Sequence, residues 1–258
     1  MKKRLLILGG TGDAAELAAR VSQIADVEVI SSLAGRTQQP LTPKTGTVRI
    51  GGFGGAAGLA EFLRRSPIDF LIDATHPFAA QISANAAVAA AECHVPHLML
   101  VRQGWEAVEG DRWIEVASHS EAAMALSGQS GRVFLTIGRQ ELAEFAGLDA
   151  IWFLMRAIDP PALNTPIPKG KLLLARGPFS LADERQLLLE YRIDTIVSKN
   201  SGGAATYAKI VAAREMGIPV VMVQRPPIPN VERVADVAGA ISWLIEQFGN
   251  GLCNGCNG

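Results

Sequence analysis

Short apolar runs alternate with segments of helical spacing along almost the whole chain of 258 residues. The stretch from Arg4 to Leu8 is almost continuously apolar, which is typical of a strand buried on both faces. From Asp13 to Ala25, apolar residues recur at the spacing of one helix face. The same order repeats toward the end of the chain. It predicts βαβ units with parallel sheets, and therefore an α/β fold.

The alternation loosens between residues 102 and 131, which predicts a boundary between two α/β layers. We therefore expect one domain over 1–115, a second over 116–248 and a flexible tail over 249–258. The expected strands cover 4–8, 27–33, 45–50, 70–74, 97–101, 112–116, 133–137, 151–156, 172–175, 195–198 and 220–223. The expected helices cover 13–25, 56–65, 79–92, 121–126, 181–191, 204–216 and 234–248.

Composition excludes several classes of function. A formal net charge of −1 argues against a nucleic-acid binder, although a local basic pocket for a small anion stays compatible with it. The longest apolar stretch, 84–91, is too short to cross a membrane, and the basic N-terminus runs into an expected strand instead of a signal peptide. Cys93, Cys253 and Cys256 are scattered and lack partner ligands, which predicts no metal site and a cytoplasmic protein.

A glycine-rich segment joins the first expected strand to the first expected helix. Counted from Gly10, it follows the pattern G-x-G-x-x-A. Glycine permits the tight turn and lets a pyrophosphate approach the backbone, while the helix N-terminus offers N–H groups to the phosphates. A tight turn without a ligand is the alternative. The expected cofactor contacts here are Gly9, Gly10, Thr11, Gly12 and Asp13.

The end of the second expected strand bears on which dinucleotide binds. Enzymes that use NAD usually carry an acidic residue there for the ribose hydroxyls, whereas Asp26 and Glu28 lie near the start of this strand. Hydroxyl groups and Arg36 suit a 2′-phosphate, so we expect NADPH, with NADH still possible. Arg36 could instead be an ordinary exposed arginine. The expected contacts are Ser32, Leu33, Ala34, Gly35, Arg36 and Thr37.

Two further strand ends point to the same edge of the sheet. Glycines surround Phe53 after the third strand, and Gly52, Phe53 and Gly54 are expected to approach the cofactor. The segment 73–78 closes the fourth strand, where open parallel sheets bind ligands. Here Ala74 and Thr75 are expected at the cofactor and His76 at the nicotinamide or substrate, although a structural role for His76 is as plausible. We expect His94, His97 and His119 to be structural.

Together these segments resemble the precorrin-6A reductases of cobalamin biosynthesis, including the cobalt-precorrin-6A reductases. The resemblance extends through both halves of the chain. It is carried by GGTGD (9–13), SLAGRT (32–37), GGFGG (51–55), DATHPFA (73–79), TIGR (136–139) and SKNSGG (198–203).

The resemblance implies two Rossmann-like domains with mainly parallel sheets and an active site in the cleft between them. It also implies an oxidoreductase that uses a reduced nicotinamide to reduce a carbon–carbon double bond of precorrin-6A, or of its cobalt form. The implied partner is thus a tetrapyrrole. The oligomeric state is left open, with a monomer as one option.

Such a substrate carries many carboxylates, so its pocket should hold cations and backbone N–H donors. Arg102 and Arg176 are weaker candidates, because surface solvation explains them as well. A general acid is also expected, and His76, Lys199 and Tyr207 have suitable side chains. The expected substrate contacts are His76, Pro77, Phe78, Arg139, Ser198, Lys199, Asn200, Ser201, Gly202 and Gly203.

Two other functions fit the dinucleotide pattern. The first is an NADPH-dependent reductase of a different, smaller substrate. The second is a non-catalytic sensor that binds the dinucleotide without turnover. Binding of a pigmented macrocycle separates the first from the expected reductase, and turnover separates the second.

Overall fold

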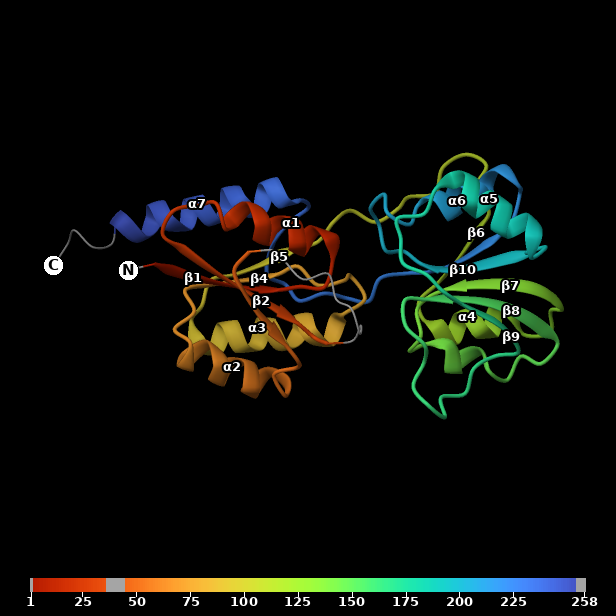
Figure 1. The fold of residues 1–258 in the computed structure, drawn as a ribbon, viewed down its shortest axis with the longest axis horizontal. Helices are drawn as coiled ribbons and strands as arrows, with labels where there is room; N and C mark the ends of the chain where they lie inside the picture. The colour runs from red at the N-terminus through yellow and green to blue at the C-terminus, as the bar shows by residue number, and fades with distance from the viewer. Residues whose placement is uncertain (1, 36–44, 254–258) are drawn as a thin grey trace. The chain divides into compact units, whose positions relative to one another are not determined.

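The computed structural model describes residues 2–35 and 45–253, with side chains described as far as residue 248. The chain divides into two units, each built around its own sheet (Figure 1). Unit 1 comprises Met1–Arg102 and Pro227–Gly258, and unit 2 comprises Gln103–Pro226. All pairings between the described strands are parallel. The expected α/β fold with two Rossmann-like sheets is confirmed.

The sheet of unit 1 has the strand order of a dinucleotide-binding fold. In that order the chain reverses direction between β1 and β4, and ligands bind at the carboxyl ends of the strands beside this point. The described strands in spatial order are β12 (Glu232–Val234), β5 (His97–Leu100), β4 (Phe70–Asp73), β1 (Lys3–Leu8), β2 (Val27–Leu33) and β3 (Thr47–Ile50).

Helices cover both faces of this sheet, which explains why its central strands are apolar throughout (Figure 1). Leu5 and Ile7 of β1 pack in one core with the first and last helices, and Leu6 and Leu8 pack in a second core with the other two. On the first face lie α1 (Gly12–Val21) and α7 (Val237–Cys253), and on the second lie α2 (Gly55–Arg65) and α3 (Ala80–Cys93).

Unit 2 repeats this plan with one change of connection. One edge strand of unit 2 comes before all the other strands of its sheet in sequence, whereas the corresponding edge strand of unit 1, β12, comes after all the others. The described strands in spatial order are β6 (Trp113–Val116), β11 (Val220–Val223), β10 (Thr195–Lys199), β7 (Gly131–Thr136), β8 (Ile151–Ala157) and β9 (Gly170–Leu174). The described helices are α4 (His119–Leu126), the 3₁₀ helix η1 (Leu142–Phe145), α5 (Leu181–Glu190) and α6 (Ala208–Glu215).

The C-terminal segment returns to unit 1, which corrects the expected domains over 1–115 and 116–248. Strand β12 pairs with β5, and Trp243 and Leu244 of α7 enter the core that contains α1. The chain therefore changes units at Arg102 and again at Pro226. Val234 was expected to open the last helix but lies in β12. A strand this short, with charged residues at two of its three positions, has no recognisable pattern of its own.

The expected tail over 249–258 is helical in its first part, because α7 continues to Cys253. Residues 254–258, and with them Cys256, lie outside the described residues. Among the described residues, no helix is both long enough and apolar enough to cross a membrane.

Trp243 connects α7 to β12. Its replacement tests whether the C-terminal segment packs as part of unit 1. Its indole Nε1 donates a hydrogen bond of 2.7 Å to Glu232, and its ring packs edge-on against Phe70. We expect Trp243→Phe to lower the free energy of unfolding by about 1–2 kcal/mol, because it removes this bond and leaves a small void. Urea unfolding measures the loss. Glu232→Gln keeps an acceptor for the indole N–H and should lower the free energy of unfolding by less. If Trp243→Phe were as stable as wild type, the proposed contribution of Trp243 to unit 1 would be contradicted.

Candidate active site

The glycine-rich turn after β1 is built as the sequence predicts. Gly10 has a φ of +111°, a conformation that favours glycine. The Thr11 hydroxyl accepts a hydrogen bond from the Ala14 N–H at 3.1 Å, capping α1, and donates one to the Ala74 carbonyl at 2.8 Å. The side chain of Thr11 is thus used within the protein. It joins the turn to the end of β4, next to the point where the strand order reverses.

The space around this turn fits a bound diphosphate. A β-carbon at Gly9 would lie 3.2 Å from that of Ala14, so this glycine allows the helix to pack closely on the strand. A β-carbon at Gly12 would meet no atom within 4 Å, and the φ of Gly12 lies outside the left-handed region. Nothing within the described protein therefore requires glycine at position 12. The open space lies at the N-terminus of α1, where backbone N–H groups favour an anion.

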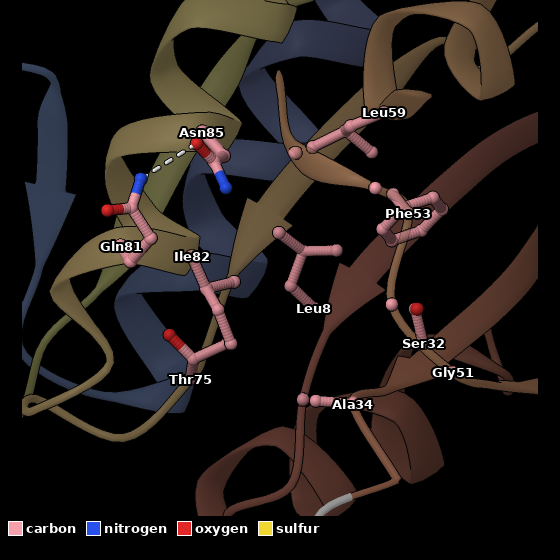
Figure 2. A pocket seen from close by; sticks show the side chains of 14 residues that line it. Leu8, Ser32, Ala34, Gly51, Phe53, Leu59, Thr75, Gln81, Ile82 and Asn85 are labelled. Atoms are coloured by element: carbon pink, nitrogen blue, oxygen red, sulfur yellow. Dashed lines mark hydrogen bonds between the residues drawn. The ribbon is translucent and has the colours of Figure 1, made fainter. Parts of the chain in front are cut away.

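A pocket of about 290 Å³ opens beside this turn (Figure 2). Leu8 lies between its two sides, with Gln81, Ile82 and Asn85 of α3 opposite Phe53. Of the residues expected at the cofactor, those that line the pocket are Gly9, Ser32, Ala34, Gly52, Phe53, Gly54 and Thr75.

The α3 residues of this pocket were not expected from the sequence. Gln81 donates a hydrogen bond of 3.0 Å to Asn85, so the two amides form a polar patch one helical turn apart. The available signal was two amides spaced i, i+4 in an otherwise alanine-rich helix. That pattern also describes an ordinary solvated helix face, and only the packing of α3 shows which face borders the pocket.

Other expected cofactor residues have different roles. The side chains of Leu33 and Ala74 are buried, so only their backbones remain for a ligand. Gly35 has a φ of +71° and lies close to Ile50, which accounts for glycine there without a ligand. Arg36 and Thr37 lie outside the described residues.

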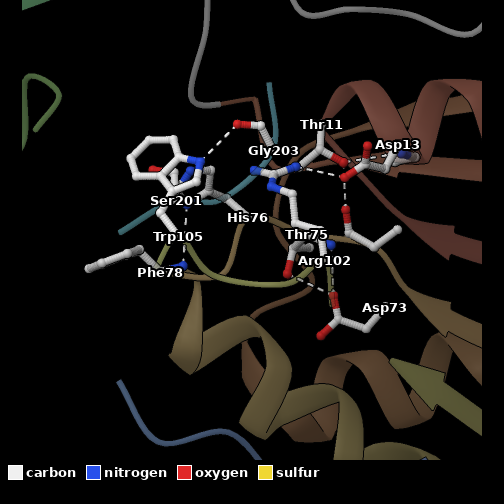
Figure 3. A network of polar contacts seen from close by, with 12 residues as sticks. Thr11, Asp13, Asp73, Thr75, His76, Phe78, Arg102, Trp105, Ser201 and Gly203 are labelled. Carbon is white, nitrogen blue, oxygen red and sulfur yellow. Dashed lines mark hydrogen bonds and ion pairs between the residues drawn. The ribbon is translucent and has the colours of Figure 1, made fainter. Parts of the chain in front are cut away.

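The segment after β4 is held by a buried carboxylate (Figure 3). Asp73 accepts hydrogen bonds from the Thr75 N–H at 3.0 Å and the Thr75 hydroxyl at 2.7 Å. Next along the chain, Nδ1 of His76 accepts a hydrogen bond of 3.2 Å from the N–H of Phe78, two residues further on. A neutral His76 then carries its proton on Nε2, which leaves that atom as the donor. The loop thus presents His76 in one tautomer on a backbone fixed by Asp73.

An ion pair closes the first turn of α1 (Figure 3). Arg102 donates to the Asp13 carboxylate at 2.6 Å. The sequence suggested that Arg102 binds substrate carboxylates, with exposure to solvent as the alternative. It also predicted that Asp13 contacts the cofactor. Their pairing gives both side chains a partner within unit 1 and neutralises part of the charge of Arg102.

In unit 2, polar side chains gather where β7 and β10 end side by side. The Lys199 ammonium lies 3.5 Å from the Glu141 carboxylate, and a β-carbon at Gly138 would come within 3.8 Å of that ammonium. Arg139 donates a hydrogen bond of 2.7 Å to the Pro160 carbonyl. The structure therefore brings the TIGR and SKNSGG segments together at the edge of the second sheet where its strands end.

His119 joins this group, although the sequence predicts only a structural histidine. Burial lowers the pKa of its imidazole, Glu141 opposes that shift, and Lys199 adds to it. These electrostatic couplings place His119 near both charged groups. His119 opens α4, which is remote in sequence from β10, so no local pattern signals the association.

Ser198 and Asn200 were expected to bind substrate, and their burial argues against direct contact. Ser198 is fully buried in β10, and its hydroxyl donates to the backbone carbonyl of Lys199. The Asn200 amide accepts from the Trp105 N–H at 2.8 Å and donates to the Trp105 carbonyl at 3.0 Å. Asn200 thus anchors the start of unit 2 to the end of β10.

The glycines of this turn are also used within the protein. A β-carbon at Gly202, where φ is +67°, would lie 2.1 Å from the Gln103 carbonyl. The Gly203 carbonyl accepts the Trp105 indole N–H at 2.9 Å, and Arg225 donates to the Ser201 carbonyl at 3.0 Å. These bonds make the turn a rigid support for Lys199.

Tyr207 is better explained by packing than as a proton donor. Its hydroxyl accepts from Arg214 at 2.8 Å, and Arg214 in turn pairs with Asp111 at 2.9 Å. The tyrosine ring packs against Trp105, with the ring centres 5.6 Å apart. A hydroxyl that accepts from a guanidinium is held in place as part of the ion-pair network.

Comparison with known proteins agrees with this arrangement. The family model described as Precorrin-6x reductase CbiJ/CobK matches residues 4–245. A precorrin-6A reductase of Rhodococcus erythropolis is 55% identical over 242 residues, covering 93% of this chain and 97% of that protein. A cobalt-precorrin-6A reductase of Methanothermobacter thermautotrophicus is 30% identical over 263 residues, covering 95% and 83%.

A solved structure supports the same relationship. The structure of CobK precorrin-6A reductase has a TM-score of 0.88 and 41% identity to this chain, covering 95% of this chain and 96% of that one. The sequence and fold matches both extend over nearly the full length. The chain therefore belongs to the precorrin-6x reductase family, a family of oxidoreductases.

Proposed function

We propose that this protein reduces a carbon–carbon double bond of metal-free precorrin-6A with NADPH. The observation that carries the proposal is the open space at Gly12, at the N-terminus of α1 and next to a pocket walled by glycines. It suits a dinucleotide whose diphosphate touches the backbone. A bound reduced nicotinamide would supply the hydride.

The end of β2 supports NADPH over NADH. Ser31 and Ser32 lie near the carboxyl end of β2, and no carboxylate stands between Ser32 and Gly35. Glu28 lies at the other end of β2, where it pairs with Arg4 at 2.9 Å. A ribose with free hydroxyls would find no acidic acceptor on this strand end, whereas a 2′-phosphate would meet hydroxyl donors.

Sequence similarity supports the metal-free substrate. Identity to the precorrin-6A reductase of Rhodococcus erythropolis is 55%, and identity to the cobalt-precorrin-6A reductase of Methanothermobacter thermautotrophicus is 30%. Both relatives match most of the chain, so the difference is not an effect of coverage.

Three of the residues expected to bind substrate or donate the proton keep those roles in this proposal. Lys199 and Arg139 lie at neighbouring strand ends of unit 2, and we assign them to the carboxylates of the macrocycle. Hydride addition to a conjugated ring system requires a proton as well. A neutral His76 only hydrogen-bonds through Nε2, so it would supply the proton from its imidazolium form. We assign the proton donor role to His76, with Lys199 as the alternative.

An anaerobic absorbance assay tests the proposal. The purified protein is mixed with NADPH and either precorrin-6A or its cobalt form, and both chromophores are followed. We expect loss of nicotinamide absorbance matched by a shift in the macrocycle spectrum, and a faster rate with the metal-free substrate. Macrocycle binding without turnover would point to a sensor. Cofactor binding without any macrocycle interaction would point to a smaller substrate.

A further inference from the structure

Arg49, a β3 residue with no role in the function described so far, touches the wall of the cofactor pocket at several points. Its guanidinium donates to the Ser32 hydroxyl at 3.4 Å, to the Gly51 carbonyl, and to the Gly52 carbonyl at 2.8 Å. It also lies over the Phe53 ring, 3.8 Å from the ring centre. All four of these partners line the pocket.

The charge of Arg49 has no counterion in the described structure. The acceptors it uses are a hydroxyl and two backbone carbonyls, and none of them is ionised. Within residues 2–35 and 45–253, no carboxylate lies within ion-pair distance of this guanidinium. By contrast, Arg4 on the neighbouring strand β1 pairs with Glu28. Arg49 is half-buried, so water screens its charge less than that of a fully exposed side chain.

The position of this charge matches one part of the proposed cofactor. In a fold with this strand order, the ribose of the adenosine half lies at the end of β2, and Ser32 lies there. Arg49 donates to the Ser32 hydroxyl from the adjacent strand β3. Among the described residues, the Nε–H and one Nη2–H of this guanidinium make no hydrogen bond, and such a group is a strong partner for a phosphate monoester through both charge and hydrogen bonds.

We propose that Arg49 binds the 2′-phosphate of NADPH and determines the preference for NADPH over NADH. This inference rests on the proposed function, because it assumes a dinucleotide in the glycine-walled pocket. The same guanidinium also holds the carbonyls of Gly51 and Gly52, so it positions the pocket wall. The two roles predict different ligand dependence: loss of positioning weakens every dinucleotide, whereas loss of the phosphate contact weakens only ligands that carry the 2′-phosphate.

The test compares ligands that differ by this phosphate alone. Dissociation constants of 2′,5′-ADP, 5′-AMP, NADPH and NADH are measured by calorimetry for wild type, Arg49→Gln and Arg49→Lys. For Arg49→Gln we expect about a 30-fold loss for 2′,5′-ADP and NADPH, and less than about a 3-fold loss for 5′-AMP and NADH. Arg49→Lys keeps the charge without the planar fork, so its loss should be intermediate. The matched control is Arg65→Gln, an exposed arginine of α2 in the same unit.

Each outcome decides the proposal. Equal losses for both members of each ligand pair would reduce Arg49 to a positioning residue and overturn the inference. Unchanged affinity for every ligand would overturn it too. Thermal melting of each variant separates these results from misfolding, and Arg49→Lys tests the inference if Arg49→Gln unfolds. If wild type binds NADH as tightly as NADPH, the inference fails while the reductase stands. If wild type binds neither and no macrocycle is reduced, the proposed function fails first.

Discussion

Gly12→Ala is expected to weaken NADPH binding by about 100-fold while the thermal midpoint stays within about 1 °C of wild type. Outside its own helix and its neighbours in sequence, the added methyl group meets no described atom within 4 Å, and the φ of Gly12 lies outside the left-handed region. The first position of α1 also tolerates alanine well, so folding has no reason to suffer. The methyl would instead occupy the space proposed for the diphosphate, and backbone N–H contacts to the phosphates would lengthen.

Two further variants separate ligand effects from folding effects. Gly147→Ala also places its β-carbon in open space, but it belongs to unit 2 and is not among the residues that line the pocket, so neither affinity nor stability should change. Gly9→Ala crowds Ala14 at 3.2 Å and should lower the thermal midpoint. Calorimetric titration with NADPH and thermal melting provide both readouts. Unchanged affinity in Gly12→Ala would show that no diphosphate lies against this turn.

Lys209→Met is expected to remove a pH dependence from the stability of unit 2. Lys209 is buried in α6, where its ammonium donates to the Thr206 carbonyl at 2.8 Å and lies over the Trp105 ring. Burial and, to a smaller extent, the charge of Arg156 lower its pKa to about 7, and Glu184 opposes the shift. Arg156 and Glu184 already pair with each other at 2.8 Å, so Glu184 is shared between two cations.

The sign of the effect follows from proton linkage. The unfolded chain keeps the ordinary lysine pKa of 10.5, so between about pH 7 and pH 10.5 it binds more protons at this site than the folded chain. The free energy of unfolding therefore rises with pH across this window, by about 2 kcal/mol between pH 7 and pH 9. Below about pH 7 both states are protonated and the destabilisation is complete.

Urea unfolding at pH 7, 8 and 9 measures this slope. Tryptophan fluorescence mainly follows unit 2, which contains Trp105, Trp113 and Trp152, while the fourth tryptophan lies in unit 1. Lys209→Met should lose the rise of about 2 kcal/mol and be more stable than wild type at pH 7, because no buried charge remains to be solvated. Lys171→Met is the control: Tyr191 raises the pKa of that exposed lysine, so it stays protonated in both states. Parallel pH profiles of wild type and Lys209→Met would contradict the burial of a titrating amine.

The parts of this protein that were predictable from sequence are those whose physical cause is local. A strand covered by helices on both faces must be apolar at successive positions, so Leu5 to Leu8 identify β1 without knowledge of its neighbours. A turn between strand and helix that must approach a ligand needs glycine, so Gly10 and Gly12 mark the carboxyl end of the strands, where we propose that the cofactor binds. The α/β class, the parallel sheets and the family resemblance all followed from such segments.

Tertiary structure decided which distant segments meet, because pairing and packing partners leave no periodic trace in either segment. Strand β12 is too short to show a pattern, yet it joins β5 and brings α7 into unit 1. Asn200 resembled a ligand contact in a polar turn, but its amide is bound to the backbone of Trp105, nearly a hundred residues earlier, and to the side chain of Gln224. Arg49 showed no motif at all. Its importance arises because β3 lies beside β2, which sets a charge that has no counterion among the described residues against Ser32 and the glycine wall of the pocket.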